Sequence, residues 1–489
     1  MDLITLIFVA FLIVLVSIWL ATGKDAKKRL PGPSGLPIVG YIPFMTKKPY
    51  VKLTELSKKY GSLYSVRLGS LDLVVITDYE IMKEAFSKDA FMGKSKNVPI
   101  QFSEETLRTE AFTGLPWKEQ RRFSIHMFNN LGFGKTRMEE HIKEEILELL
   151  EIMSEYVGKP TSLSVFLIPS MSNIIASVLF GKRLKYNDPE RQKLDSLLRE
   201  FAKLAGTLSS QTFFPWLKPL MSYINNKNYS RIIEVLEEIK VYCRNEIKQH
   251  EAALDPNNIR DFLDGYLLEV EKKSNDPNTT FKKGVLEDLS RGFFAAGSET
   301  VRVTVDWMLC ICAAYTQVQK RIQAEIDEVV GRERFPTWQE RLRMPYTEAA
   351  IAELMRWRTI VPLNMRCTLQ NTELNGYFIP KHTTVLSVFW AIDHEENLWG
   401  KDVHDYKPER FLSPDGQKVL KPEHAIPFSV GKRSCPGKSL AEIEVFLYIV
   451  AILQKFDVSA PPGKEIDLEG ELGISLQPKQ QDLCLKLRH

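Results

Sequence analysis

A short segment near the C-terminus constrains the fold of this chain more than any other part of the sequence. Residues 428–437 read FSVGKRSCPG, and apolar residues follow at helical spacing from Leu440 onward. This spacing predicts a helix that begins directly after Gly437. Cys435 is therefore expected just ahead of a helix N-terminus, where backbone N–H groups and the helix dipole favour a thiolate over a thiol.

The surroundings of Cys435 indicate an axial ligand for haem iron. Arg433 adds a fixed positive charge, and Gly431 and Gly437 let a flat ligand approach the backbone. Haem iron with axial sulfur ligation needs a lone, stabilised thiolate of this kind. The alternative is a buried, inert thiol, which is the usual fate of a single free cysteine. Six cysteines in 489 residues are too few for a disulfide scaffold, and we expect Cys310 and Cys312 to be core residues of a helix.

The N-terminal segment predicts a membrane anchor. Residues 3–21 carry no charge and consist mainly of Leu, Ile, Val and Phe, which is just long enough to span the hydrocarbon core of a bilayer. Basic residues at 24–29 follow at once, and they predict that the body of the chain lies in the cytosol. The alternative is a cleaved signal peptide, which would carry its positive charge before the apolar run.

The chain divides into a membrane anchor at 1–23, a basic and Pro-rich spacer at 24–40 and one large catalytic domain at 41–489. Three prolines within residues 31–37 predict a stiff, extended spacer. Apolar spacing predicts helices at 138–157, 231–243, 284–315 and 346–358. Alternating residues predict a hairpin of 63–68 with 71–77, and a second sheet region from 376–380 and 383–388. The expected fold class is mainly α with a smaller β portion.

A second motif lies on the predicted helix at 284–315, where residues 293–300 read FFAAGSET. A glycine inside a helix costs about 1 kcal/mol relative to alanine, so Gly297 requires a reason. A small residue lets a ligand lie close to the helix, and the Thr300 hydroxyl can bond the carbonyl four residues earlier. Glu299 and Thr300 would then relay protons. The alternative is a small-residue helix crossing with Glu299 in solvent.

Two further motifs pair an arginine with another side chain. Glu353 and Arg356 share a helix face and can form an ion pair. Arg410, within the segment YKPERF, can complete a three-way network with them. Trp117 and Arg121 also share a helix face, and both donate hydrogen bonds suited to a carboxylate. A tryptophan stacked under an arginine, with no ligand, is the alternative for this last pair.

These four motifs, in this order, resemble the cytochrome P-450 superfamily of haem-thiolate monooxygenases, and the anchor with its Pro-rich spacer resembles the microsomal animal type. The resemblance runs from the anchor to near the C-terminus. It implies the cytochrome P-450 fold, a single catalytic domain preceded by a transmembrane anchor. It also implies haem b (iron protoporphyrin IX) as the cofactor and O2 as a co-substrate.

The resemblance assigns roles to individual positions. Cys435 is the implied iron ligand, and the implied haem-binding set is Cys435, Trp117, Arg121, Arg366, Arg433, Phe428, Gly431, Gly437 and Lys94. Lys94 stands where relatives often have arginine, and a lysine lacks the two-pronged guanidinium. Arg366 stands where many relatives have histidine. Thr300 is the implied proton relay with Glu299 in support, and the implied structural residues are Glu353, Arg356 and Arg410.

The implied reaction inserts one atom of O2 into a lipophilic small molecule: a steroid, fatty acid, terpenoid or xenobiotic. The expected substrate pocket comprises Phe293, Ala296, Gly297, Val361, Leu363 and Ile474, with the segments 95–112 and 201–214. The sequence has no GxGxxG motif, so electrons must come from a partner, an NADPH-dependent cytochrome reductase, with cytochrome b5 as a second donor. The expected basic dock for the reductase consists of Lys118, Arg122, Lys432 and Lys438.

The implied location is the endoplasmic reticulum membrane, with a single pass and the catalytic domain facing the cytosol. A net charge of +3 gives no argument for nucleic acid. Two alternatives remain. A haem-thiolate isomerase or dehydratase would work without O2, but such relatives tend to lose the acid–threonine pair at 299–300. A membrane-anchored haem binder without turnover would have a closed distal side.

Overall fold

The computed structural model describes residues 30–94, 102–132, 136–205, 213–214 and 227–488. The predicted anchor at 1–23, and the part of the spacer before Leu30, lie outside these ranges and stay predictions. Among the described helices, none combines the length and the apolar character that crossing a bilayer requires. The pocket segments 95–101 and 206–212 also lie outside the described residues.

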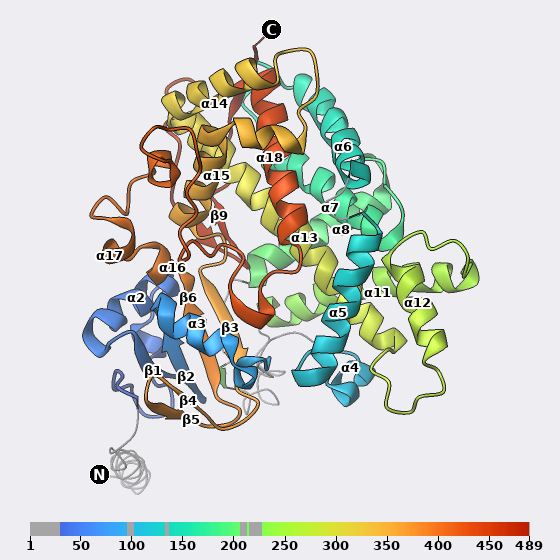
Figure 1. Cartoon of the computed structure of the whole chain (residues 1–489), viewed down its shortest axis with the longest axis vertical. Coiled ribbons are helices and arrows are strands. Elements are labelled where there is room, and N and C mark those ends of the chain that lie inside the picture. Colours follow the sequence, from blue (N-terminus) through green and yellow to red (C-terminus); the bar gives the residue numbers. More distant parts are fainter. Residues whose placement is uncertain (1–29, 95–101, 133–135, 206–212, 215–226, 489) are drawn as a thin grey trace, which may run out of the picture.

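Helices make up most of the molecule, and β1 to β6 gather at one side of it, whereas β9 lies near its centre (Figure 1). The long helices are α5 (Gly114–Asn130), α6 (Thr136–Ser154), α7 (Ser164–Phe180), α8 (Pro189–Ala205), α11 (Lys227–Ala252), α12 (Phe262–Lys272), α13 (Lys283–Ala314), α14 (Thr316–Val329), α15 (Pro345–Arg358) and α18 (Lys438–Lys455). The shorter ones are α2 (Pro49–Tyr60), α3 (Tyr79–Ser87), α4 (Glu104–Thr109), α16 (Phe389–Asp393) and α17 (Glu396–Trp399). The expected fold class, mainly α with a smaller β portion, is confirmed.

The largest sheet has four strands in the order β1 (Leu63–Leu68), β2 (Leu71–Ile76), β6 (Thr384–Val388), β3 (Leu363–Cys367). Smaller two-stranded sheets pair β4 (Thr372–Leu374) with β5 (Tyr377–Ile379), β8 (Gly470–Leu472) with β9 (Leu476–Pro478), and β7 (Phe456–Ser459) with β10 (Cys484–Leu487). Short 3-10 turns occur at 42–44, 89–91, 338–343, 408–411 and 431–433.

The predicted hairpin is confirmed, and so is each predicted helix within a few residues at its ends, except that 231–243 is only the middle of α11. The predicted second sheet region is wrong as a unit. β5 pairs with β4, whereas β6 runs parallel to β2 and antiparallel to β3 within the main sheet. All residues of β6 are buried. A strand with neighbours on both sides finds them through the tertiary fold, which local alternation does not specify.

The described part of the spacer lies against the sheet rather than standing free. The backbone N–H of Ser65 donates to the Pro31 carbonyl at 2.8 Å, and that of Tyr41 donates to the Arg67 carbonyl at 2.7 Å. The predicted extended backbone is confirmed only before Leu36, because residues 36–40 form a tight turn in which Leu36 and Gly40 exchange backbone hydrogen bonds at 2.9 Å.

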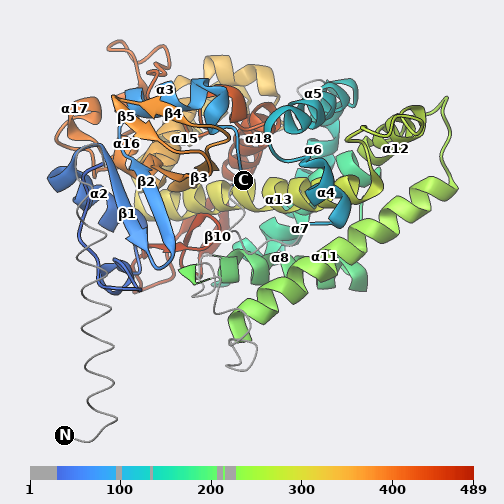
Figure 2. The ribbon, with the colours of Figure 1, turned by 90° about the horizontal axis from the view of Figure 1, so that it is seen from below.

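Helix α13 organises the interior. Figure 2 shows it running across the molecule, with the main sheet at one end and α11 and α12 at the other. Its second half is buried on every face, and Cys310 and Cys312 are core residues there, as predicted. It packs against α7 and α18, and α18 carries the segment 428–437 at its N-terminal end. The two motif-bearing helices are thus held beside each other.

Candidate active site

Cys435 lies in a loop that the start of α18 and two backbone contacts hold in place. Helix α18 begins at Lys438 with Gly437 as its N-cap, and the Cys435 N–H donates to the Phe428 carbonyl at 2.8 Å. Gly431 has φ +75°, and a Cβ there would collide with the Phe86 carbonyl of α3. Only glycine tolerates both conditions. The predicted placement of Cys435 ahead of a helix is confirmed.

The electrostatic expectation for Cys435 is only half met. Cys435 is exposed to an open cavity, yet the protein atoms around it still desolvate its thiol and raise the pKa, while the Gly437 N–H and the Arg121 charge lower it by less. The predicted stabilising groups are therefore present, yet they do not outweigh desolvation in the protein alone. A coordinating thiol is deprotonated outright by a bound metal ion. The loop supplies the position of the ligand, and the iron would supply the ionisation.

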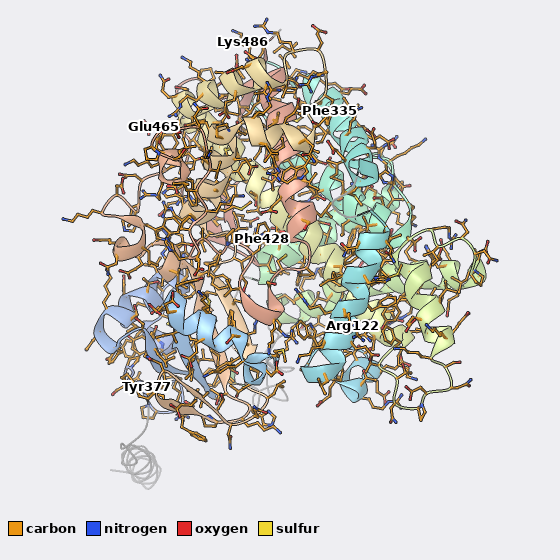
Figure 3. The ribbon with its side chains drawn as sticks, in the orientation of Figure 1. Arg122, Phe335, Tyr377, Phe428, Glu465 and Lys486 are labelled. Atoms are coloured by element: carbon orange, nitrogen blue, oxygen red, sulfur yellow. The ribbon has the colours of Figure 1, made fainter. Side chains whose placement is uncertain are left out.

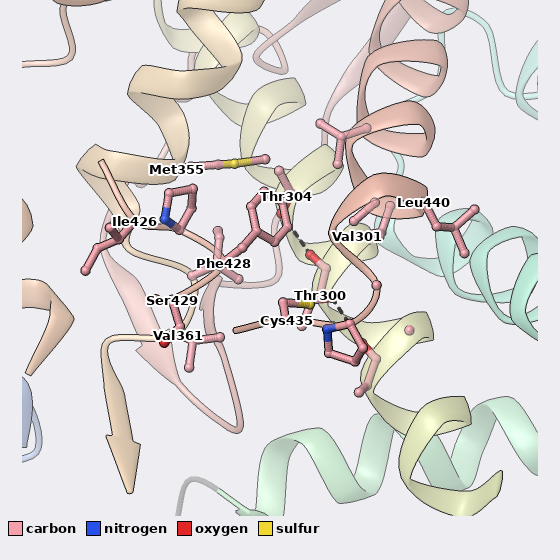
Figure 4. A pocket seen from close by; sticks show the side chains of 18 of the residues that line it. Thr300, Val301, Thr304, Met355, Val361, Ile426, Phe428, Ser429, Cys435 and Leu440 are labelled. Carbon is pink, nitrogen blue, oxygen red and sulfur yellow. Dashed lines mark hydrogen bonds between the residues drawn. The ribbon is translucent and has the colours of Figure 1, made fainter. Parts of the chain in front are cut away.

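A cavity of about 300 Å³ separates the loop from α13. Cys435 and Phe428 of the loop and Thr300, Val301 and Thr304 of α13 line this cavity (Figure 4). The predicted pocket residues Phe293, Ala296, Gly297 and Val361 line this cavity. An open space next to the Ala296–Gly297 segment is what the sequence predicts for a distal site.

Two predicted pocket residues are placed elsewhere. Leu363, on β3, packs against the core under the main sheet. Ile474, at the turn between β8 and β9, is 43% exposed, and its N–H donates to the Ala202 carbonyl at 3.0 Å. Neither is among the residues that line the cavity. The direction of a side chain on a short strand or turn depends on register, which the sequence did not specify.

A cluster of cations lies beside the cavity, and two of its members, Arg366 and Arg433, line it. Burial and neighbouring arginines lower the pKa of Arg433 to about 9, and burial and Arg121 lower that of Arg366 to about 10. Burial, followed by Arg433, Arg291 and Arg366, lowers the pKa of Lys94 to about 8. The Nε of Arg433 is buried without a hydrogen-bond partner. Such a group of cations is stabilised by anions, so the residues fit the two carboxylates of a haem.

Trp117 stacks with the arginines that flank it. The guanidinium of Arg433 lies 3.9 Å from the centroid of the Trp117 ring, and that of Arg121 lies 5.5 Å from it. Arg121 Nη2 also donates to the Ser434 carbonyl at 2.7 Å, and Arg366 Nη2 donates to the Arg433 carbonyl at 3.2 Å. An arginine therefore does stack on Trp117, and Arg433 lies closer to the ring than the predicted Arg121. Because these contacts fix the arginines close to Cys435, the proposed haem-binding role is compatible with it.

Each interpretation of the α13 motif is confirmed in part. The Thr300 hydroxyl donates to the Ala296 carbonyl at 3.0 Å, as predicted. A Cβ on Gly297 would lie 3.0 Å from Cγ1 of Ile175 on α7, so the glycine permits a tight helix crossing. Gly297 lines the cavity as well. One glycine serves the crossing and the open space.

Glu299 contributes neither to the α13–α7 helix crossing nor to the lining of the cavity. Its carboxylate accepts from Arg302 Nη2 at 2.8 Å and Nε at 3.0 Å, and from the Ser475 hydroxyl at 3.2 Å. It is not among the residues that line the cavity. The alternative of a solvated Glu299 is wrong, and its predicted support of a proton relay stays a prediction that this geometry does not favour. The sequence signal that was missed is an arginine three residues after the glutamate.

The second Glu–Arg motif is a buried three-way network. Arg356 donates to Glu353 through Nε at 2.7 Å and Nη2 at 2.8 Å, and Arg410 Nε lies 3.4 Å from the same carboxylate. The predicted network is confirmed. The sequence did not reveal two further acids that line the cavity, Asp393 and Glu444. Both are buried, and burial raises the pKa of Asp393 to about 8.

The four residues of the expected basic dock differ in their surroundings. Lys118 pairs with Asp89 at 3.1 Å, and Lys432 pairs with the same carboxylate. Arg122 is exposed on α5 (Figure 3), and Lys438 lies 5.9 Å from the Phe428 ring. Asp89 thus offsets part of the positive charge of this face. The pairing could not be predicted from local spacing, because Asp89 is 29 residues from Lys118 and 343 residues from Lys432 along the chain.

The comparisons with known proteins agree with this site. The family model for cytochrome P-450 matches residues 30–485. The chain is 34% identical to cytochrome P-450 18a1 of Drosophila melanogaster over 484 residues, which cover 96% of this chain and 89% of that protein. It is 34% identical to cytochrome P-450 2J2 of Homo sapiens over 469 residues, which cover 94% and 92%. The chain belongs to the cytochrome P-450 family, and it is an oxidoreductase of the haem monooxygenase type.

Proposed function

We propose that the protein inserts one atom of O2 into a lipophilic small molecule, with electrons from an NADPH-dependent reductase. The observation that carries the proposal is the cavity between Cys435 and Thr300, with a cluster of cations at its edge. Haem b, when bound there, supplies the activation of O2 and the oxidation of a C–H bond. The side chains of this protein bind the cofactor, deliver protons and exclude water.

Those side chains divide into three tasks. Cys435 holds the iron, and Arg121, Arg366, Arg433 and Lys94 hold the two propionates with charge-assisted hydrogen bonds. The Thr300 hydroxyl, fixed by its bond to the Ala296 carbonyl at 3.0 Å, is placed to accept a proton from solvent and pass it into the cavity. Apolar side chains exclude bulk water from the rest.

The lining of the cavity supports a lipophilic substrate. On the α13 side it is formed mainly by aromatic and aliphatic residues, including Phe128, Ile175, Phe293, Ala296, Val301 and Val361. Apolar surface of this kind binds ligands through the hydrophobic effect and provides few polar contacts for recognition. Steroids, fatty acids, terpenoids and xenobiotics all remain within the proposed class. Optical titration of the holoenzyme with one compound of each type, read as displacement of the iron-bound water, ranks them.

The decisive test is oxygen incorporation. Purified holoenzyme is given NADPH, a reductase, 18O2 and the best ligand of the titration, and the product is examined by mass spectrometry. We expect one labelled oxygen atom per product and no product without NADPH. Product formed without NADPH would instead support the isomerase or dehydratase. No product under any condition would support the haem binder without turnover. Cys435→Ser is the matched control, and its ferrous carbonyl adduct should lose the absorbance band typical of thiolate-ligated haem.

The electron donor is proposed to dock on the face that carries Lys118, Arg122, Lys432 and Lys438. Arg122 is exposed, whereas Lys118 and Lys432 share Asp89. Opposite charges steer association at low ionic strength. Arg122→Glu together with Lys438→Glu should slow reduction of the haem by the reductase at low salt, with the difference disappearing at high salt. An unchanged rate at low salt would remove this face as the dock. Cytochrome b5 would compete for the same surface.

The proposal includes a single-pass location in the endoplasmic reticulum membrane, with the catalytic domain at 41–489 facing the cytosol. Its support is the apolar run at residues 3–21 and the basic residues that follow. In microsomes, the full chain should resist extraction by alkaline carbonate, and protease added from the cytosolic side should degrade the catalytic domain. Release by carbonate would contradict the anchor at 1–23.

A further inference from the structure

Arg302 is a buried arginine on α13, two residues after Thr300, to which neither the family resemblance nor the proposed reaction gives a role. Only 5% of it is exposed. Its Nε and Nη2 bind the two oxygens of Glu299 at 3.0 and 2.8 Å. Burial lowers the pKa of Arg302, but Glu299 and Asp306 raise it further, so the net shift is upward. The side chain is therefore charged at any physiological pH.

Arg302 also joins α13 to two other segments. Nη1 donates to the Ser164 hydroxyl at 2.8 Å, at the start of α7, and Nη2 donates to Gln477 Oε1 at 2.9 Å, on β9. Asp306, one helical turn further along α13, lies 3.5 Å from Nη1. All three nitrogens of the guanidinium are in use, and a planar fork of five donors is the only side chain that can serve them together.

The β8–β9 hairpin connects this network to the cavity. The Leu476 N–H donates to the Ile360 carbonyl at 2.8 Å, and Ile360 lines the cavity. Trp307 Nε1 donates to the Leu476 carbonyl at 2.8 Å, and Ser475 donates to Glu299 at 3.2 Å. Direct hydrogen bonds therefore connect the hairpin to three residues of α13: Trp307, Glu299 and Arg302. None of the hairpin residues is among those that line the cavity, so the hairpin reaches the cavity through Ile360.

We propose that Arg302 is a positioning residue that holds the Glu299 carboxylate out of the cavity and uses it, together with Gln477, to fix the β8–β9 hairpin against α13. The inference rests on the proposed function for its catalytic consequence. It assigns Glu299 to the shape of the substrate space and leaves proton delivery to Thr300. Loss of Arg302 should then weaken ligand binding, whereas loss of Thr300 should waste electrons.

The alternative is an ion pair that stabilises α13 and influences nothing else. The two ideas differ in which segment of the protein loosens when Arg302 is replaced. Both predict some loss of overall stability, but a purely structural pair would loosen only α13 around residues 299–306. A positioning residue would loosen the hairpin at 470–478, which is more than 160 positions away along the chain, and would change how the cavity binds a ligand. Hydrogen exchange and a haem ligand can separate these outcomes.

The experiment compares holoenzyme variants of the full chain. Arg302→Gln removes the charge, Arg302→Lys keeps it without the fork, and Gln477→Ala removes only the contact to the hairpin. Arg244→Gln is the matched control. Arg244, on α11, donates two hydrogen bonds to Glu287 of α13 at 3.0 and 3.1 Å, away from the contacts of Arg302. The probe is 4-phenylimidazole, which ligates ferric haem and fills the distal space. The readouts are its dissociation constant from the optical shift and the deuterium uptake of residues 470–478.

We expect Arg302→Gln to raise the dissociation constant of 4-phenylimidazole about tenfold, a change of about 1.4 kcal/mol, and to speed exchange in the hairpin. Arg302→Lys should restore part of the affinity because it keeps the positive charge on one hydrogen-bonding nitrogen, and Gln477→Ala should reproduce the hairpin effect at full stability. Arg244→Gln should change neither readout. Glu299→Gln should weaken binding without increasing peroxide release.

Unchanged exchange at 470–478 in both Arg302→Gln and Gln477→Ala would overturn the inference, and so would peroxide release by Glu299→Gln as large as that of Thr300→Ala. If Arg302→Gln does not fold, Gln477→Ala alone decides, since it leaves no charge unpaired. Failure of the proposed function would show differently: the wild type would incorporate no oxygen, while the exchange and 4-phenylimidazole results would stand.

Discussion

Two helices of this protein carry the same local device, a glutamate followed by an arginine three residues later, and use it differently. On α15, Glu353 and Arg356 pair at 2.7 and 2.8 Å, and on α13, Glu299 and Arg302 pair at 3.0 and 2.8 Å. Both arginines are almost fully buried. The remaining donors of Arg356 go to backbone carbonyls, those of Asp393 at 2.8 Å and Asp405 at 3.4 Å.

The remaining donors of Arg302 go to side chains, those of Ser164 and Gln477. Backbone carbonyls are fixed by the fold, so the α15 pair anchors segments that cannot adapt. Side-chain partners can change rotamer at a cost of about 1 kcal/mol, so the α13 pair connects segments that retain some freedom. A buried ion pair contributes little net stability and mainly specifies an arrangement. The further partners of each arginine, backbone carbonyls or side chains, decide whether the ion pair stabilises the fold or positions a segment of the site.

The largest effect is expected on α15. Arg356→Ala leaves Glu353 buried and without its main partner, and breaking a buried pair in this way costs about 3–5 kcal/mol. Chemical denaturation should show that loss, and little haem should be retained after purification. A variant with normal haem content and stability would mean that the α15 network does not brace the fold.

A smaller loss is expected on α13. Arg302→Gln keeps a hydrogen-bonding group beside Glu299, so we expect a fall of about 2 kcal/mol in the free energy of unfolding, with normal haem content. Denaturation under the conditions used for Arg356→Ala gives the comparison. Equal losses at the two sites would erase the distinction between a bracing pair and a positioning pair.

The pH dependence of the free energy of unfolding tests the protonation state of Asp393, whose backbone carbonyl accepts a hydrogen bond from Arg356 of α15. Burial raises the pKa of Asp393 from 3.8 to about 8, and Thr359 and Arg356 oppose this by less. The folded protein therefore binds the proton more tightly than the unfolded chain, so this contribution to stability is full below about pH 4 and is lost as the pH rises toward 8. Asp393→Asn should flatten that part of the profile. A slope unchanged by the substitution would show that Asp393 is ionised in the folded protein.

The smallest change in stability is expected at Thr300. Thr300→Ala removes one hydroxyl bonded to its own helix, which costs about 1 kcal/mol or less, and leaves the Glu299–Arg302 pair in place. The effect should appear in chemistry: less product per NADPH consumed and more hydrogen peroxide. An unchanged ratio of product to NADPH would show that Thr300 does not relay protons, and the difference between the two residues at 299 and 300 would be lost.

Local signals in the sequence predicted much of the fold. The periodicity of α6, α13 and α15 follows from their apolar faces, and the β1–β2 hairpin follows from two alternating runs around Gly69-Ser70. The partner of β6 did not follow, because β2 and β3 reach it from distant parts of the chain. The positions of Leu363 and Ile474 outside the cavity depend on the same long-range register.

The candidate site shows the same division. The sequence by itself determined that Cys435 precedes a helix, that Thr300 bonds back to Ala296 and that Glu353 can reach Arg356, because each relation is set by the backbone geometry of a few neighbouring residues. Only the tertiary structure decided that Arg433 stacks on Trp117, that Asp89 binds two lysines, and that the Glu299–Arg302 pair meets the β8–β9 hairpin. Charge and burial depend on which distant segments meet, and spacing along one helix carries no information about those partners.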